Sequence, residues 1–173
     1  MAIYALGNRE PTIDSTAFVH PQATVIGEVT IGAGSSIWPQ AVLRGDGRGC
    51  IRIGDGTSIQ DGTVVHTTDE HPTIVGSRCV IGHLVHLEGC VVEDDVLVGN
   101  GSVVLHRALL RTGCLVGSNA VVTNDTEVPS RAMALGIPAK ILLDRVDPAM
   151  IADAAQKYLE RSVSYRTDLR RLD

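Results

Sequence analysis

The sequence predicts an all-β solenoid, a left-handed parallel β-helix of hexapeptide repeats with a C-terminal α-helix, assembled as a trimer. Three observations support this fold class. An aliphatic residue recurs every six positions through most of the chain, a glycine often follows it, and the 173 residues include one Trp, one Phe and three Tyr. A core of small aliphatic side chains in a fixed repeat is typical of a solenoid.

The period of six separates this fold from the alternatives. The repeated aliphatic positions are Ile31, Ile37, Leu43, Ile53, Ile59, Val65, Val75, Ile81, Leu87, Val92, Val98, Val104, Leu110, Val116 and Val122. A period of two describes an ordinary strand and one of 3.6 an amphipathic helix, whereas six indicates short strands joined by identical corners, three to a triangular coil. An antiparallel sandwich would show turn signals roughly every 8–12 residues without a fixed register.

The repeat ends near Gly136-Ile137-Pro138-Ala139-Lys140, and Asp147-Pro148 supplies a helix cap with proline at the first helical position. We therefore expect a β-helix domain over residues 1–145 and a C-terminal segment over 146–173, with a helix at roughly 148–170. Ile151, Ala154, Tyr158 and Leu159 share one face of that helix, which should pack along the side of the solenoid.

Composition narrows the function classes. A net charge of −5 argues against binding to nucleic acid or to an anionic membrane, because both partners demand a dense basic face. Neither a leader-like start nor an apolar run of about 20 residues is present, so the expected location is the cytoplasm. Cys50, Cys79, Cys90 and Cys114 form no CxxC pair and are read as reduced residues, with Cys79 and Cys114 at small inward positions of the repeat.

Two four-residue insertions stretch the period to ten, between Leu43 and Ile53 and between Val65 and Val75. Counting three units per coil then places Leu43, Val65 and Leu87 on one face of successive coils. The residues that follow them, Arg44, His66 and Glu88, should form a column with a spacing of about 4.8 Å. By the same count Asp61 lies below His83, with Gln60 beside them, in a second column.

Two histidines and a carboxylate make a known zinc set in which a fourth position is left for water. The columns stand at different corners of one chain, so the sequence predicts a site between subunits of a homotrimer. His86 is the main rival to Glu88 as third ligand, and His71 is a weaker one. A lone surface histidine is more often simply solvated, and His20 and His106 join no recognisable constellation.

These motifs carry a family resemblance. Arg44-Gly45-Asp46, Ile59-Gln60-Asp61-Gly62, His66 and Gly82-His83, all on hexapeptide repeats, resemble γ-class carbonic anhydrases over roughly residues 10–145. The resemblance implies that His66 and His83 bind a metal ion from different subunits. It also implies that Arg44, Asp46 and Asp61 form an ion-pair network across the trimer interface, and that Gln60 hydrogen-bonds the metal-bound water or the substrate.

The chain departs from the family pattern at three places. Glu88 stands where the family has its third histidine, five residues after the second, and Ser58 stands where it often has asparagine. A carboxylate ligand would make the metal a poorer Lewis acid and slow the reaction. The long acidic loop that carries the family's proton shuttle is absent, which leaves Asp69 and Glu70 in the second insertion as substitutes.

The resemblance implies hydration of CO₂, a small-molecule substrate, by Zn²⁺, or by Fe²⁺ or Co²⁺ in the same site, with bicarbonate as product. One alternative is a related metal-binding trimer that hydrolyses a thioester or binds without catalysis. Another is a coenzyme A-dependent acyltransferase, a chemistry common on this solenoid. The insertions look too short for the extended loop on which such enzymes usually carry their catalytic histidine.

Overall fold

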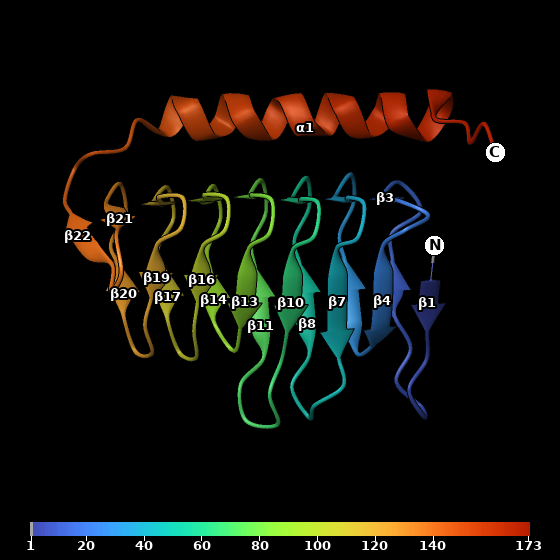
Figure 1. Ribbon diagram of the computed structural model, residues 1–173, viewed down its shortest axis with the longest axis horizontal. Coiled ribbons are helices and arrows are strands. Elements are labelled where there is room, and N and C mark those ends of the chain that lie inside the picture. The colour runs from blue at the N-terminus through green and yellow to red at the C-terminus, as the bar shows by residue number, and fades with distance from the viewer. Residues whose placement is uncertain (1) are drawn as a thin grey trace.

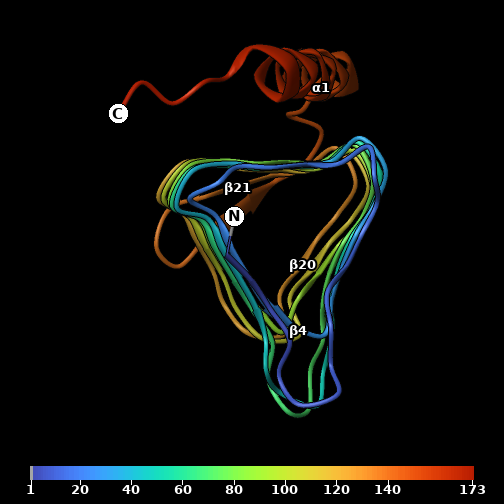
Figure 2. The same cartoon turned by 90° about the vertical axis from the view of Figure 1, so that its right-hand side faces the viewer.

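The computed structural model describes residues 2–173 and is a left-handed parallel β-helix with one long helix beside it (Figure 1). Viewed along its axis, the solenoid has a triangular cross-section whose sides are three sheets (Figure 2). The first and second sheets have seven strands and the third has eight. The predicted fold class is confirmed, whereas the single chain does not test the trimer.

The strands of the first sheet are β1 (Ala2–Tyr4), β4 (Thr24–Gly27), β7 (Val42–Gly45), β10 (Val64–His66), β13 (His86–Glu88), β16 (Val103–Val104) and β19 (Val121–Val122). The second sheet comprises β2 (Thr12–Ile13), β5 (Val29–Ile31), β8 (Ile51–Ile53), β11 (Thr73–Val75), β14 (Val91–Val92), β17 (Leu109–Leu110) and β20 (Glu127–Val128). The third comprises β3 (Phe18–Val19), β6 (Ser36–Ile37), β9 (Ser58–Ile59), β12 (Val80–Ile81), β15 (Leu97–Val98), β18 (Leu115–Val116), β21 (Met133–Leu135) and β22 (Lys140–Leu142).

The register follows the count of the repeat. Val65 pairs with Leu43 below it and with Leu87 above it, and Ile81 pairs with Ile59. All five side chains are fully buried in one continuous aliphatic core. Cys79, Cys90 and Cys114 are buried as well, and burial raises the pKa of the Cys79 thiol to about 12, so these cysteines are packing residues.

Where a glycine follows an inward aliphatic residue, it is needed because successive coils approach closely. At Gly54 a β-carbon would lie 2.6 Å from the carbonyl carbon of Gly76 on the next coil, although the φ angle of Gly54 is an ordinary one. Left-handed corner residues include non-glycines such as Gln40 and Leu84. Glycine recurs at this position because the next coil lies too close for a β-carbon, and not because the position requires an unusual φ angle.

The two insertions form loops at one corner of the triangle, between β7 and β8 and between β10 and β11 (Figures 1 and 2). They extend outward without disturbing the pairing of the strands that flank them. At the far end of the solenoid, β22 turns back antiparallel to β21 and ends the repeat.

Helix α1 (Pro148–Asp168) lies along the third sheet and ends two residues before the expected end (Figure 1). Asp147 caps it by accepting a hydrogen bond from the backbone of Ala149. The buried face carries Ile151 and Ala155, with Tyr158 and Leu159 half-buried, close to the face that the sequence indicates. No helix in residues 2–173 has the length and apolarity to cross a membrane.

The stacked core predicts a large effect of truncation at any inward position. Leu110 is fully buried in the second sheet, so Leu110→Ala should lower the free energy of unfolding by about 2–5 kcal/mol in urea denaturation. Leu143 is 64% exposed, and Leu143→Ala should change it by less than about 0.5 kcal/mol. Equal losses of unfolding free energy in the two variants would contradict the placement of Leu110 in the core and of Leu143 outside it.

Candidate metal centre

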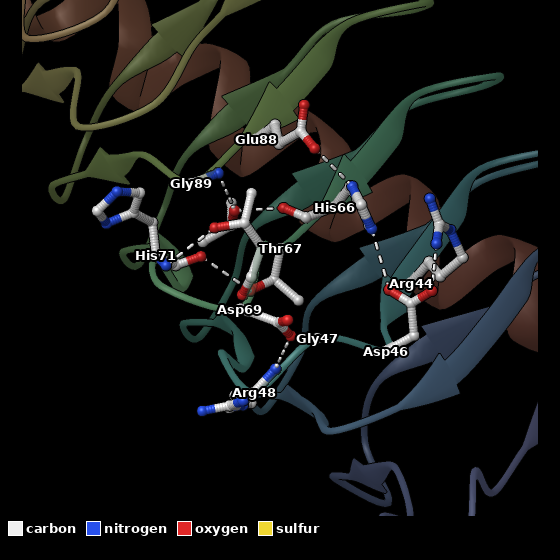
Figure 3. A network of polar contacts seen from close by, with 12 residues as sticks. Arg44, Asp46, Gly47, Arg48, His66, Thr67, Asp69, His71, Glu88 and Gly89 are labelled. Atoms are coloured by element: carbon white, nitrogen blue, oxygen red, sulfur yellow. Dashed lines mark hydrogen bonds and ion pairs between the residues drawn. The ribbon is translucent and has the colours of Figure 1, made fainter.

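The first column forms as counted. His66, the last residue of β10, pairs with Arg44 of β7 on one side and with Glu88 of β13 on the other. All three side chains point away from the core, because the alternate residues Leu43, Val65 and Leu87 point into it. The parallel stacking of three successive coils therefore creates this polar column at the edge of the first sheet (Figure 3).

His66 lies between two carboxylates. Its Nδ1 is 2.7 Å from Oε1 of Glu88, and its Nε2 is 3.0 Å from Oδ1 of Asp46 (Figure 3). The guanidinium of Arg44 donates to the second oxygen of Asp46. Burial raises the pKa of Asp46, but hydrogen bonds from His66 and Arg44 outweigh it and hold that pKa below its ordinary value.

Glu88 has three imidazoles around it. Besides His66 at Oε1, Nε2 of His86 lies 3.3 Å and Nε2 of His106 lies 3.5 Å from Oε2. The carboxylate is 23% exposed, and burial acts to raise its pKa. Hydrogen bonds from His66 and His86 act the other way, so the pKa of Glu88 lies below its ordinary value and the group is ionised.

The second column also forms. Asp61 and His83 follow β9 and β12, and Oδ2 of Asp61 is 2.9 Å from Nδ1 of His83. This contact engages Nδ1 of His83, and no hydrogen bond engages its Nε2 among residues 2–173. Gln60 precedes Asp61 and is 2% exposed. The hydroxyl oxygen of Ser58 accepts a hydrogen bond at 2.9 Å from Nε1 of Trp38, which gives this departure from the family pattern a packing role.

The two columns stand at opposite ends of the first-sheet strands. Asp61 and His83 lie in the corners that precede β10 and β13, whereas His66 and Glu88 are the last residues of those strands. Within residues 2–173 no group of three or more His, Cys, Asp or Glu side chains is arranged to hold a metal ion. One chain thus presents two partial donor sets and no complete one.

The insertion after β10 holds the remaining candidates. Oδ1 of Asp69 accepts a hydrogen bond from the backbone of Arg48 in the neighbouring loop, so its carboxylate ties the two loops together (Figure 3). Glu70 is 85% exposed, 3.9 Å from Nε2 of His71. The same nitrogen of His71 lies 3.2 Å from the guanidinium of Arg107, so neither His71 nor Asp69 reaches the first column.

His106 is the residue at this site to which the sequence assigns no role. Leu87 pairs with Val104, so His106 lies one coil further on, beyond the end of β16. Its ring reaches back to Glu88 across Gly89, where a β-carbon would stand 3.2 Å from Cδ2 of His106 and 3.0 Å from Cβ of His71. A glycine directly after Glu88 was the available signal, because it leaves room for a ring from the next coil.

This packing predicts an unequal cost for two glycine substitutions. Gly89 and Gly113 both have φ in the left-handed region, at 61° and 74°, but a β-carbon at Gly113 would meet nothing within 4 Å. Gly113→Ala should cost about 1–2 kcal/mol of unfolding free energy from backbone strain alone. Gly89→Ala should cost about 1–3 kcal/mol more, because the His71 and His106 side chains must move. Equal losses in urea denaturation would contradict the packing of His106 on Gly89.

Comparison with known proteins supports the family resemblance. Mitochondrial γ carbonic anhydrase 1 of Arabidopsis thaliana is 40% identical over 159 residues, which is 87% of this chain and 58% of the relative. The chain therefore spans less than two thirds of that plant protein. The carnitine operon protein CaiE of a Proteus species is 38% identical over 150 residues, 87% of this chain and 76% of the relative. No protein-family model matches the chain.

Among solved structures, a hexapeptide transferase family protein from Anaplasma phagocytophilum is 36% identical with a TM-score of 0.89, covering 95% of this chain and 98% of that one. Fold and side-chain columns together define a hexapeptide-repeat β-helix protein with paired histidine–carboxylate groups on its outer surface. The chain belongs to the γ-class carbonic anhydrase-like family of these proteins, to which the identity with CaiE and the plant relative assigns it.

Proposed function

We propose that the protein is a metal-dependent hydratase that converts CO₂ and water to bicarbonate, with its active site between the subunits of a homotrimer. The observation that carries the proposal is the pair of partial donor sets at opposite ends of the first-sheet strands. Each set contains a histidine already oriented by a carboxylate, and neither supplies three ligands. A neighbouring copy of the chain would complete the set.

The donor chemistry fits a divalent ion. Histidines that bind metals usually donate their other ring N–H to a carboxylate, which fixes the tautomer and the ring. Asp61 stands in this relation to Nδ1 of His83, and Asp46 stands in it to Nε2 of His66. Nδ1 of His66 and Oε1 of Glu88 are in hydrogen-bond contact, and an ion held by His66, Glu88 and the partner subunit's His83 would replace that hydrogen bond.

When bound, Zn²⁺, Fe²⁺ or Co²⁺ supplies hydroxide near neutral pH by lowering the pKa of a water molecule. Arg44 holds Asp46, which keeps His66 in one orientation for the incoming ligand. Gln60, buried beside Asp61, would orient the water or CO₂. Glu70 is exposed and would pass the released proton to buffer, whereas Asp69 is engaged with Arg48.

The first sheet offers a surface on which copies could assemble. Its outward row consists of Ala2, Thr24, Val42, Val64, His86, Val103 and Val121, so five of the seven side chains are apolar. Val64 is 36% exposed in the middle of this row. The row runs between the two columns, and an interface that covers it would bring one copy's His66 and Glu88 toward its neighbour's second column.

A buried charge in that row should prevent assembly. We expect Val64→Asp to shift the protein from a trimer to a monomer in light scattering, because an unpaired carboxylate would be desolvated in the interface. Val91→Asp is the matched control, since Val91 is 38% exposed on the outer face of the second sheet. Dissociation by Val91→Asp, with Val64→Asp still trimeric, would move the interface to the second sheet.

The metal site is tested by elemental analysis with CO₂ hydration measured in parallel. The wild-type protein should hold roughly one ion per subunit, and His66→Ala and Glu88→Ala should lose both the ion and the activity. Glu10→Ala is the control, because Glu10 is an exposed carboxylate that belongs to neither column. Chelation should abolish the activity of the wild type.

The His86→Ala variant decides whether Glu88 or His86 is the third metal ligand. Retention of metal in Glu88→Ala together with its loss in His86→Ala would assign the third position to His86. Absence of metal from the wild-type protein would refute the hydratase proposal.

A second candidate function is hydrolysis of an ester or thioester by the same site. Glu88 is the observation that favours it, because two histidines and one glutamate form the ligand set of several hydrolytic zinc enzymes. A metal-loaded trimer that hydrolyses thioesters and leaves CO₂ unchanged would support this candidate. Binding of acetyl-coenzyme A without metal would instead favour an acyltransferase, in keeping with the likeness to the hexapeptide transferase family protein from Anaplasma.

A further inference from the structure

A glutamate at the position of Glu88 carries a disadvantage that a histidine does not. Its side chain has one more rotatable bond, so fixing it in a single rotamer costs more conformational entropy. A carboxylate used as a ligand therefore needs other groups to hold it before the ion arrives. In the metal sites of proteins such groups are hydrogen-bond donors behind the ligand.

The two oxygens of Glu88 differ in their surroundings. Oε1 faces Nδ1 of His66 at 2.7 Å, on the side of the first column. Oε2 faces the other way, with Nε2 of His86 at 3.3 Å and Nε2 of His106 at 3.5 Å. His86 comes from the same strand, two residues earlier, whereas His106 comes from the next coil. Oε1 is thus the ligand atom of the proposed site, and Oε2 is the atom held from behind.

Nε2 of His106 has no other polar partner among the described residues. It is buried and has no hydrogen-bond partner within normal geometry, which is an unfavourable state for a polar atom. The nearest acceptor that the structure gives it is Oε2 of Glu88, slightly beyond hydrogen-bond length. Such contacts are often long in ligand-free sites and shorten once the ligand is bound.

The ring is also prevented from turning away. Gly89 lies beneath it and has space for the ring only because it lacks a β-carbon. The backbone of Arg107 donates to the carbonyl of Gly89 at 2.7 Å, which ties the segment that carries His106 to the residue that follows Glu88.

We propose that His106 is a positioning residue that holds Oε2 of Glu88 from the adjacent coil and so presents Oε1 as a metal ligand. The proposal rests on the proposed role of Glu88 in metal binding. His106 would thus allow a glutamate to act as the metal ligand at the position where the family has a histidine.

The test is the affinity of the full-length protein for Zn²⁺, measured by competition with a chromophoric chelator. His106→Ala should weaken Zn²⁺ binding by about 10–100-fold, the usual effect of losing a group that holds a ligand. His106→Gln should restore affinity to within a few-fold of wild type, because its amide N–H can reach the same oxygen while the amide is a poor zinc ligand. His71→Ala is the matched control, since it removes the neighbouring ring and leaves the contacts of Glu88 in place, and its affinity should equal that of wild type.

Unchanged affinity in His106→Ala would overturn the proposal, as would an equal loss in His71→Ala, which would indicate a general packing effect. An equal loss in His106→Ala and His106→Gln would overturn it in another way, by indicating that His106 binds the ion itself. Failure of the wild-type protein to bind Zn²⁺ would refute the proposed metal site as a whole, so the two failures are distinguishable.

Discussion

The register between successive coils is the constraint on which the rest of the structure depends. Each coil hydrogen-bonds to the next in parallel, and the inward aliphatic residues fix that pairing because a slip of one residue would expose the entire core. Outward side chains must then stack at the strand spacing of about 4.8 Å. Arg44, His66 and Glu88 are neighbours for this reason, although 22 residues separate each from the next.

The sequence alone predicts the features that depend on the register between coils. The period of six predicted the fold class, the pairing of His66 with Glu88 and the pairing of Asp61 with His83, because these follow from counting alone. The count survives the insertions since both loops leave at the same corner. The position of Asp46 opposite Nε2 of His66 could not be counted, because Asp46 follows the end of β7 in an inserted loop whose path depends on its own contacts.

The contacts of Glu88 were beyond prediction for a different reason. The repeat predicts that His86 points outward, but its approach to Oε2 of Glu88 depends on the rotamers of two side chains on one strand. His106 reaches Glu88 because Gly89 leaves space for its ring; the glycine is visible in the sequence, but the side chain that fills the space cannot be found by counting repeats. Repeat counting therefore predicts which strand residues stack along the axis of the solenoid. It does not predict contacts made by residues outside the strands.

These contacts bear on the chemistry that a glutamate ligand permits. An ionised carboxylate would make a bound ion less acidic than a neutral imidazole would, and this is the argument against fast hydration at Glu88. The imidazoles of His86 and His106, however, face Oε2 and would draw electron density from it. A carboxylate whose charge is shared in this way donates less to an ion and comes closer to a neutral ligand. The surrounding histidines thus compensate, in part, for the histidine that Glu88 replaces.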